Sequence, residues 1–483
     1  MLPLFLVIIS SILQTAGSYS QAQDNKNASF NRTSNRHRSV SADKACLNLE
    51  TSIAIAMNNN FELRAIKAQR EVYDLTIIER LRDYFPTLSL SYLQTEESVK
   101  RDADTRQHRV SADAEMVLFD GGKRSLSYDV AKLRAILARN DYRLAVNTLV
   151  TEIRSAYFNI LQLRDSIGIH KKTLEYGNMQ LQFISKELEL GEATRFDRME
   201  IEAKVKEVEL NLEKAKDDYT LVLNRFKIML KIDWRQVIEV TGDIERDFII
   251  QPIDESYNID MLTALAVKNR KEIESSRVDL AIKKRTYLIN KLYYFPKFSV
   301  GLNYSLSDDT FMPREKGWGI NFKVTAALWG NTGSLSSGYN EDNNKNSRTL
   351  SNSSSIAILN DLPYKRNIVE SKIELDRSRE KRKDTEQQIS IEVTSAYTAL
   401  KNSWTMIEIA KKQLELYDAQ LVIERLKANM GESRRYDLMK KEIERGEAAI
   451  AYLQSLVRYL TTASTLETAL GVDVGFLKLS KMK

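Results

Sequence analysis

The residues that could support catalysis or bind a metal are few and scattered. The chain of 483 residues has three histidines, His37, His108 and His170, and one cysteine, Cys46. No two of these four side chains are within helical reach of one another, so the sequence predicts no zinc or iron site of the usual His and Cys kind within one chain. A single cysteine cannot form an internal disulfide, and we expect Cys46 to be a buried free thiol.

A nucleotide-binding or hydrolytic site is also not indicated. The segment Gly121-Gly122-Lys123 resembles the end of a P-loop, but Val117 stands where the motif needs its first glycine. Neither a Gly-x-Ser-x-Gly nor a His-Glu-x-x-His motif occurs, and no carboxylate pair stands out among 66 acidic residues. We therefore expect no enzyme, no cofactor and no metal.

Composition limits the classes of protein further. The 72 basic and 66 acidic residues give a net charge of only +6, which indicates a mixed, solvated surface and not a nucleic-acid-binding protein. After the first fifteen residues, no stretch approaches the roughly 20 apolar residues of a membrane-spanning helix. With only 17 Gly and 6 Pro, the chain is expected to form long uninterrupted helices that position whatever site it has.

The N-terminus predicts export. An apolar run from Leu2 to Leu13 is followed by Ser20-Gln21-Ala22, a small-x-small cleavage site, so residues 1–22 are predicted to be a signal peptide. Residues 23–43 are rich in Asn, Ser and Arg and are expected to form a flexible arm.

An internal repeat organises the rest of the chain into residues 44–254 and 255–483. Tyr84-Phe85-Pro86 recurs as Tyr294-Phe295-Pro296, and the segment from Gly191 to Met199 recurs from Gly431 to Met439. The first pair of segments is 210 residues apart and the second pair is 240 residues apart. The difference of thirty residues indicates an insertion in the second copy, over about 330–363. Its Ser- and Asn-rich sequence predicts a polar loop.

Each repeat contains a predicted β-hairpin, over about 87–118 and 297–328. Apolar and polar residues alternate there in strands of about ten residues, which is the pattern of a transmembrane β-strand. Aromatic residues at the helix-side strand ends predict a girdle at a lipid interface: Tyr84, Phe85, Phe119, Tyr294, Phe295 and Trp329. An ordinary half-buried hairpin, with the aromatics as core residues, remains the alternative.

The helices that follow the hairpins are unusually long. Residues 125–189 have a helical pattern of roughly 100 Å, and Gly191 and Gly431 are the expected turns between descending and ascending helices. Four strands cannot close a membrane barrel, since open edges would leave unpaired backbone groups in lipid. Two chains would supply eight strands and three would supply twelve. The predicted fold class is therefore mainly α, a long antiparallel α-helical barrel, with four transmembrane β-strands per chain.

Several motifs recur in a fixed order along the chain: Leu47-x-Leu49-Glu50, the run from Ala54 to Leu63, Phe85-Pro86 before a strand, Leu118-Phe119-Asp120-Gly121-Gly122-Lys123 after one, and the two Gly-to-Asp turn motifs. In these motifs the chain resembles the TolC family of outer-membrane efflux and secretion channels. It implies a homotrimer that closes a twelve-stranded barrel in outer-membrane lipid and extends into the periplasm as a helical barrel. Its implied partners are a periplasmic adaptor and an inner-membrane RND, ABC or MFS pump, in tripartite efflux or type I secretion.

The resemblance also places the two glycine turns at a periplasmic tip. There Gly191, Glu192, Thr194, Gly431, Glu432 and Ser433 would contact the adaptor, and Asp197 and Asp437 would gate the channel with Arg195 and Arg435 as partners. An acid in the first turn of a helix is also favoured by the helix dipole alone, so helix capping remains an alternative role for both aspartates. Lys440 stands where the family often has a second acid, which leaves ion selectivity open.

A different class of protein is also compatible with the pattern. A periplasmic coiled-coil scaffold could have the same long helices, with hairpins that only pack on them. Neither the cargo nor the pump type can be predicted from the sequence.

Overall fold

The computed structural model describes residues 45–98, 105–248, 250–252, 258–311, 313–342 and 347–472. The predicted signal peptide, 1–22, and arm, 23–43, lie outside the described residues. The chain divides into a large unit, Leu47–Trp234 with Val240 onward, and a small unit whose described part is 45–46 with Arg235–Glu239.

Strands β1 (Ala45–Leu47) and β4 (Ile238–Val240) form a two-stranded sheet. Cys46 is exposed, so the prediction of a buried thiol is wrong. The reason is local. Side chains alternate along a strand, and Leu47 is the buried residue of this pair.

The first repeat contains α2 (Leu49–Asn59), α3 (Phe61–Arg82), β2 (Thr87–Glu97), β3 (Thr105–Phe119), α4 (Lys123–Glu189) and α5 (Arg195–Met229). One helix was expected before the hairpin, and the structure divides it at Asn60. This residue has extended backbone angles, φ −69° and ψ 112°, and its side chain accepts a hydrogen bond from the Leu63 backbone N–H at 3.2 Å. Asn60 therefore ends α2 and caps α3.

The second repeat follows the same plan, after a short helix α6 (Ile244–Asp247). It contains α7 (Ile259–Asn269), α8 (Lys271–Lys291), the 3₁₀ turn η1 (Leu292–Tyr294), β5 (Lys297–Asp308), β6 (Glu315–Leu328), β7 (Asn331–Asp342), β8 (Ser347–Ala357), α9 (Pro363–Asn429) and α10 (Arg435–Leu470). The helix break recurs at Arg270, which also has extended backbone angles. The repeat is thus visible in both the elements and the break.

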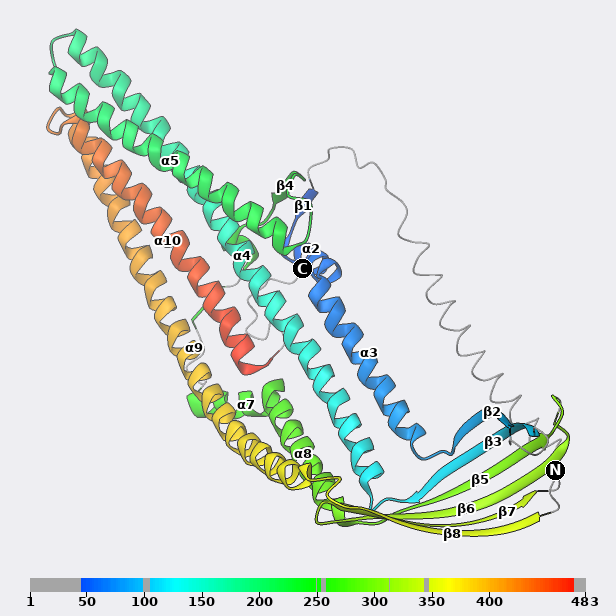
Figure 1. Cartoon of the computed structure of the whole chain (residues 1–483). Coiled ribbons are helices and arrows are strands. Elements are labelled where there is room, and N and C mark those ends of the chain that lie inside the picture. The colour runs from blue at the N-terminus through cyan, green and yellow to red at the C-terminus, as the bar shows by residue number, and fades with distance from the viewer. Residues whose placement is uncertain are drawn as a thin grey trace. The chain divides into compact units, whose positions relative to one another are not determined.

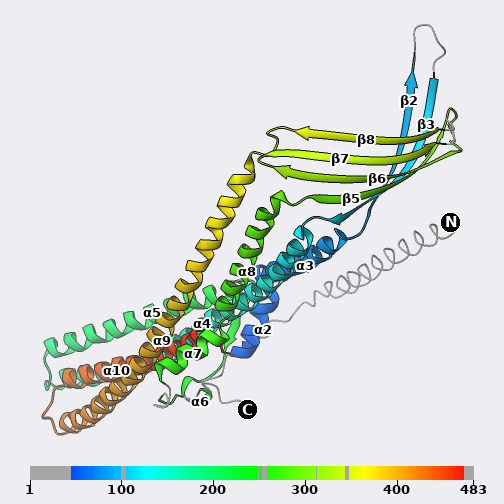
Figure 2. The ribbon, with the colours of Figure 1, turned by 90° about the horizontal axis from the view of Figure 1, so that it is seen from below.

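All six long strands form one antiparallel sheet in the order β2-β3-β5-β6-β7-β8. The predicted hairpins are present as β2–β3 and β5–β6, and they lie next to each other because β3 pairs with β5. Figure 1 shows the strands in this order, and Figure 2 shows β5 to β8 side by side with the β2–β3 hairpin at a steep angle to them. The sheet therefore joins the two repeats.

The insertion corrects the predicted loop and the predicted strand number. Residues 331–357 form a third hairpin, β7–β8, so the sheet has six strands and not four. Trp329 and Gly330, with φ of 50° and 84°, make the two-residue turn from β6 into β7. Two successive positive φ angles are typical of the turn type that matches strand twist. Ser, Asn and Gly have low strand propensity, but pairing with β6 along twelve residues compensates.

The long helices pack in the order α5, α4, α10, α9, so the two helical hairpins meet at α4 and α10. Figure 1 shows these helices side by side. Arg154 on α4 and Glu467 on α10 form an ion pair of 3.0 Å that is almost completely buried. Thr151 and Thr468 join the same two helices by a hydroxyl contact of 2.9 Å. None of the helices in the described ranges has the length and apolar character needed to cross a membrane.

Candidate functional site

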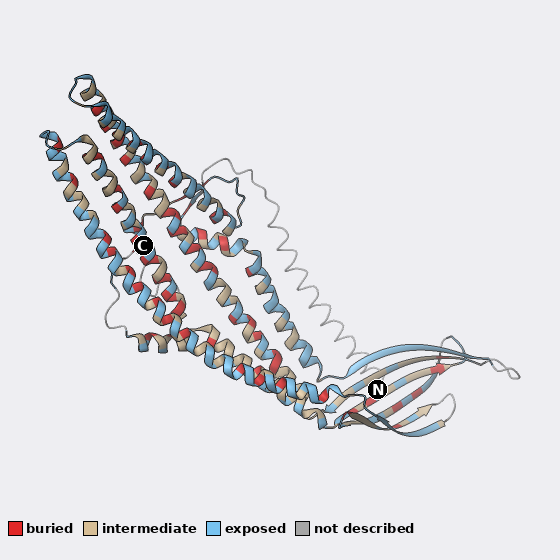
Figure 3. Ribbon diagram, turned by 60° about the vertical axis from the view of Figure 1, so that its left-hand side comes forward, coloured by how far each residue is buried: buried red, intermediate tan, exposed pale blue. Residues whose placement is uncertain are grey.

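The six-stranded sheet has one apolar face, and that face is exposed. Paired residues on neighbouring strands share a face, and the register aligns apolar residues from β2 to β6, for example Leu90, Ala112, Tyr304 and Trp318. On β7 and β8 the same face is mixed: it carries Leu335, Tyr339, Leu350 and Ile356 together with Ser337, Glu341, Arg348 and Asn352. Leu90 is 79% exposed, Phe322 57% and Ile356 75%. Figure 3 shows long exposed stretches on the strands, with some buried segments among them, and buried residues that recur along the long helices. An exposed apolar surface of this extent is unusual for a face that contacts water.

The other face of the sheet is polar and hydrogen-bonded. Hydroxyl pairs cross neighbouring strands at 2.6–2.7 Å: Ser91 with Ser111, Ser334 with Ser355, and Ser336 with Ser353. In the middle of this face, the amide side chains of Asn321 and Asn340 lie over Gly301 and Gly319. A Cβ atom at Gly319 would be 1.9 Å from Asn340 Oδ1, so a larger residue there would displace the Asn340 amide. The sheet is thus apolar on one side and polar on the other.

The six predicted girdle residues all lie at the helix-side end of the sheet. Phe85, Phe119, Tyr294, Phe295 and Trp329 are exposed, and Tyr84 is half-buried. Phe295 packs on Gly121, where a Cβ atom would be only 2.7 Å from the Phe295 Cβ, and the rings of Phe119 and Phe298 are 6.1 Å apart. This exposure argues against the alternative in which the aromatic residues form part of a core.

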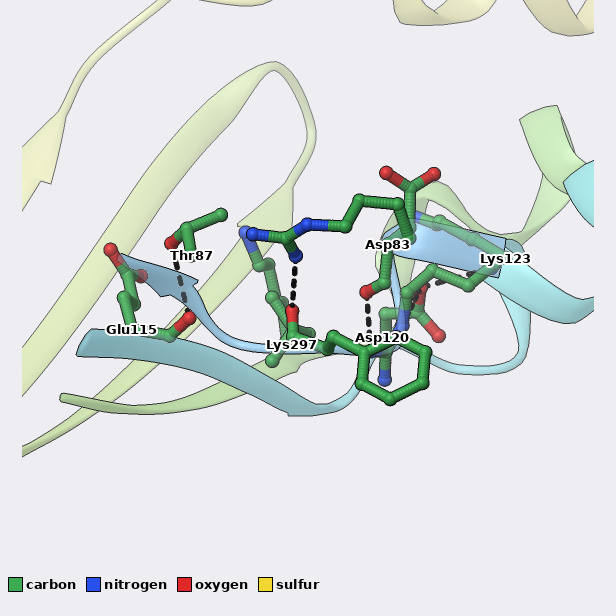
Figure 4. Close-up of a pocket in the computed structure, with 10 residues that line it drawn as sticks. Asp83, Thr87, Glu115, Asp120, Lys123 and Lys297 are labelled. Carbon is green, nitrogen blue, oxygen red and sulfur yellow. Dashed lines mark hydrogen bonds and ion pairs between the residues drawn. The ribbon is translucent and has the colours of Figure 1, made fainter. Parts of the chain in front are cut away.

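A pocket lies on the polar side of the strand-to-helix junction (Figure 4). It is lined by four basic and three acidic residues, together with Phe85, Thr87 and Val117: Arg82, Lys123, Arg124 and Lys297, and Asp83, Glu115 and Asp120. Arg124 Nε lies 3.2 Å from Asp120 Oδ2, and Thr87 Oγ1 donates to the Glu115 carbonyl at 3.1 Å. Partial burial lowers the pKa of the Lys123 ammonium. These contacts stiffen the junction, and the balanced charge does not indicate a particular ligand.

The first glycine turn connects α4 to α5. Gly191 has φ 81°, and the Gly191 and Glu192 N–H groups donate to the carbonyls of Leu188 and Glu187 at 3.1 and 2.8 Å. This is a Schellman ending, which requires the left-handed conformation that glycine adopts readily. Gly191, Glu192 and Thr194 are all exposed.

Asp197 and Thr194 form a capping box at the start of α5. Thr194 Oγ1 accepts from the Asp197 N–H at 3.2 Å, and Asp197 Oδ2 accepts from the Thr194 N–H at 3.0 Å. The Thr194 hydroxyl also donates to Asp197 Oδ2 at 2.6 Å. These hydrogen bonds, with a smaller contribution from the positive charge of Arg434, lower the pKa of Asp197. Capping therefore accounts for this aspartate within one chain.

The second glycine turn has the same backbone but a different cap. Gly431 has φ 76°, and the Glu432 N–H donates to the Lys427 carbonyl at 2.9 Å. Arg434 stands at the position of Thr194 and makes no side-chain cap; its Nε lies 3.6 Å from Asp437 Oδ2. Ser433 donates to the Glu424 carboxylate. Gly431 and Glu432 are exposed, and Ser433 is half-buried.

Arg435 connects the two helical hairpins. Its Nη2 lies 3.1 Å from Glu187 Oε1 in the last turn of α4, and its guanidinium carbon is 5.3 Å from the centre of the Phe183 ring. Both side chains of the pair are about one quarter exposed. The structure thus brings Arg435 to Glu187 and not to Asp437. Arg195 is exposed and has no ion pair within the part of the chain that the structure describes.

A small apolar core holds the two turns together just behind this ion pair. Met439 of α10 is completely buried among Ile184 of α4 and Ile201, Val205 and Val208 of α5. Gly177 of α4 makes room for it, because a Cβ atom there would be 2.7 Å from Met439 Cε. The two hairpins are therefore packed as well as ion-paired.

Three residues of this tip were not predicted from the sequence: Glu187, Arg434 and Gly177. Alignment of the repeats contained a signal for two of them. Glu187 corresponds to Lys427, and Thr194 corresponds to Arg434, so each position changes charge between the copies. Among the described residues, no group of three or more His, Cys, Asp or Glu side chains could hold a metal ion.

Comparison with known proteins agrees with this architecture. Residues 52–229 match a family model described as "Outer membrane efflux protein". The fold is similar to that of MtrE, an outer membrane channel of Neisseria gonorrhoeae, with a TM-score of 0.71, 15% identity, and coverage of 88% of this chain and 89% of MtrE. It is also similar to CusC, with a TM-score of 0.71, 14% identity, and coverage of 91% and 96%. No protein with a curated description matches the sequence.

A crystal structure of a membrane protein from Pseudomonas aeruginosa is similar as well, with a TM-score of 0.71, 16% identity, and coverage of 88% and 93%. At these identities the likeness to the solved structures is one of fold, and the family match adds that residues 52–229 resemble outer membrane efflux proteins. The resemblance to the TolC family is confirmed, and with it the TolC-like fold, mainly α with an antiparallel sheet. The predicted outer-membrane location agrees with the description of the matched family.

Within this TolC-like chain, two features depart from what the family resemblance implies. One is the third hairpin of the sheet. The other is the charge at the second turn, where Arg434, Arg435 and the exposed Lys440 accompany Asp437. The turn is therefore locally basic and not acidic.

Proposed function

We propose that the chain is a passive exit duct of the outer membrane, in a tripartite efflux or type I secretion system. The observation that carries this proposal is the sheet with one exposed apolar face and one polar face, whose strands continue at one end into 67-residue helices. Lipid would cover the apolar face, and the polar face would line an aqueous path. The long helices would extend that path into the periplasm.

Closure of the duct requires more than one copy. A single sheet has two edge strands whose unpaired backbone groups would cost several kcal/mol each in lipid. We propose a homotrimer, in which three sheets form one barrel and three pairs of helical hairpins form one helical tube. The aromatic residues at the helix-side ends, Trp329 and Phe119 among them, would lie at the periplasmic lipid interface.

The two glycine turns are proposed as the tip that meets the adaptor and controls the opening. Gly191, Glu192 and Thr194 in one turn, and Gly431, Glu432 and Ser433 in the other, are the candidate contact residues, and most of them are exposed. We propose that Asp197, Asp437, Arg195 and Arg435 gate the duct, together with Glu187, since the Arg435–Glu187 pair ties the two hairpins of a chain. An RND, ABC or MFS pump in the inner membrane would supply the energy.

Membrane extraction separates this proposal from the coiled-coil scaffold. An integral duct remains in the outer-membrane fraction after washing with carbonate and with urea, because its strands lie in lipid. A scaffold whose hairpins only pack on helices is released by both washes. A matched control is a peripheral protein of the same fraction, which must be released under the conditions used.

A further inference from the structure

The third hairpin moves the edge of the sheet from β6 to β8. Strand β7 pairs with β6 along its whole length, from Leu328 opposite Asn331 to Gly317 opposite Asp342. The pairing is reinforced on the polar face, where the Asn303 amide donates to Asn340 Oδ1 at 3.4 Å and the Asn340 side chain lies over Gly319. The edges of the sheet are therefore β2 and β8.

We propose that β8 of one copy pairs antiparallel with β2 of the next copy, so that three copies close a barrel of eighteen strands. In the proposed register Ile356 lies opposite Leu88, and Arg348 lies opposite Glu96. The inference rests on the proposed trimeric duct, and it identifies the surface that joins its subunits. That surface is the pair of sheet edges, and its occupant is a second copy of the chain.

The two edges match in length and direction. β2 and β8 each have 11 residues, so this register pairs them from end to end. Consecutive strands alternate in direction around the sheet, so β8 runs opposite to β2 as an antiparallel neighbour must. Every β2 residue and all but the first β8 residue are exposed, as expected for edges that another chain covers.

The faces and charges match as well. The register keeps apolar-face residues together, with Ile356 beside Leu88, and puts Ser353 opposite Ser91 on the polar face. Serine pairs of this kind already join β2 to β3 and β7 to β8 on the polar face. At the far end, Arg348 pairs with Glu341 of its own chain at 3.4 Å, and Glu96 pairs with Arg106 at 2.7 Å. The register would bring these two exposed ion pairs together, with Arg348 facing Glu96. A shift by one residue would instead turn apolar residues toward the polar face.

The same register satisfies the geometry of a closed barrel. The residue pairs of neighbouring strands lead across one sheet from Leu90 through Ala112, Tyr304, Trp318 and Glu341 to Arg348. When Arg348 pairs with Glu96 of the next copy, the path reaches β2 again six residues beyond Leu90. Each chain therefore contributes a stagger of six residues. Three copies then accumulate a stagger of about eighteen residues over eighteen strands, which tilts the strands by about 35° and falls at the lower end of the usual range.

Neighbouring registers fit less well. Two residues less of stagger per chain lowers the tilt to about 25°, below the usual range. Two residues more gives about 42°, but it places Arg348 opposite Ser98 and leaves the first two residues of β2 unpaired. Because barrel diameter grows roughly linearly with strand number, the eighteen-stranded lumen would be about half as wide again as one of twelve strands.

Disulfide trapping in outer membranes tests the seam in the full-length chain. The background is Cys46→Ser, since the native thiol is exposed. Two differently tagged chains are co-expressed, one with Ser91→Cys and the other with Ser353→Cys, and oxidised. We expect a covalent dimer that carries both tags, and no such band when Ser91→Cys is combined with Asn352→Cys, which lies on the opposite face.

Other pairs of cysteine substitutions test the competing subunit contacts. A dimer from Ser91→Cys with Lys323→Cys would show that β6 is the edge and would overturn the inference. A stronger dimer from Ser91→Cys with Ser355→Cys would overturn the register. Native mass separates these failures from failure of the duct itself: particles of three chains with the wrong cross-link contradict only the seam, whereas single chains contradict the proposed function.

Discussion

Arg435, in the first turn of α10, is held 3.1 Å from Glu187, in the last turn of α4, although the two residues are 248 positions apart. The pair links the second helical hairpin to the first at the end where both hairpins turn. Behind it, Met439 is buried in the core of the first hairpin. If the two hairpins separate when the tip opens, the ion pair must break and Met439 must leave this core. If the core stays intact, the hairpins must move together.

Removing the ion pair should loosen the tip. We expect Arg435→Ala and Glu187→Gln each to raise the resting conductance of the channel in planar bilayers, because each leaves its partner charge half-buried and unpaired. Asp437→Ala, which frees Arg434, should act in the same direction. Arg198→Ala is the matched control, since Arg198 is an exposed arginine of α5 without an ion pair in the described parts of the chain. Unchanged leakage in all three tip variants would contradict a gating role for these residues.

The cap at Asp197 should depend on pH. Its pKa is lowered below the ordinary value of 3.8 by the hydrogen bonds from Thr194. A carboxyl whose pKa is lower in the folded state stabilises the fold above its unfolded pKa, and this contribution is lost as the pH falls through the folded pKa. The first turn of α5 should therefore be fully capped at neutral pH and fray below about pH 4.

Hydrogen exchange of the amides from Thr194 to Met199, corrected for intrinsic rates, measures this fraying. Asp197→Ala should lose a few tenths of a kcal/mol, up to about 1 kcal/mol, of helix stability at neutral pH and should no longer respond to acid. Thr194→Ser retains the hydroxyl and should behave as the wild type. An equal acid response in Asp197→Ala and wild type would contradict the role of this carboxylate.

Gly177 should be required for packing and not for backbone conformation. A valine there would clash with Met439 and Val205, so we expect Gly177→Val to destabilise the tip by about 1 to 3 kcal/mol in spite of its better helix propensity. Gly168→Val on the same helix is the matched control, because a Cβ atom at Gly168 meets nothing within 4 Å. Limited proteolysis at the turns reports the difference. Recovery in Gly177→Val with Met439→Ala would identify the clash as the cause.

Trp329 should lie at a lipid interface. In variants that retain one of the four tryptophans, lipids brominated near the headgroup should quench Trp329 fluorescence more strongly than lipids brominated at the chain end. Trp404 on α9, which donates to Glu408 at 3.0 Å, is the control and should not be quenched by either. Equal quenching, or none, at Trp329 would contradict the girdle.

Much of the fold could be predicted because it depends on local patterns. Alternation of apolar and polar residues predicted β5 and β6, and the scarcity of Gly and Pro predicted α4 and α9. The third hairpin could not be predicted in this way. Its Ser- and Asn-rich strands have the composition of a loop, and they become strands because the edge of β6 offers them a ladder of hydrogen bonds.

At the tip, too, features that depend on local sequence could be predicted, and features that depend on packing between helices could not. Gly191 and Gly431 were predicted as turns because only the backbone of the turn is involved. The partner of Arg435 was not predicted, since Glu187 meets it only when α4 packs on α10. Cys46 was expected to be buried from its residue type, whereas the alternation of β1 decides its exposure.

Single-channel conductance of the purified full-length protein in a planar bilayer, recorded from detergent particles of measured native mass, tests the central claim most directly. A trimeric duct predicts particles with the mass of three chains that open discrete, ion-conducting channels. Particles of a single chain that leave the bilayer without conductance would contradict it.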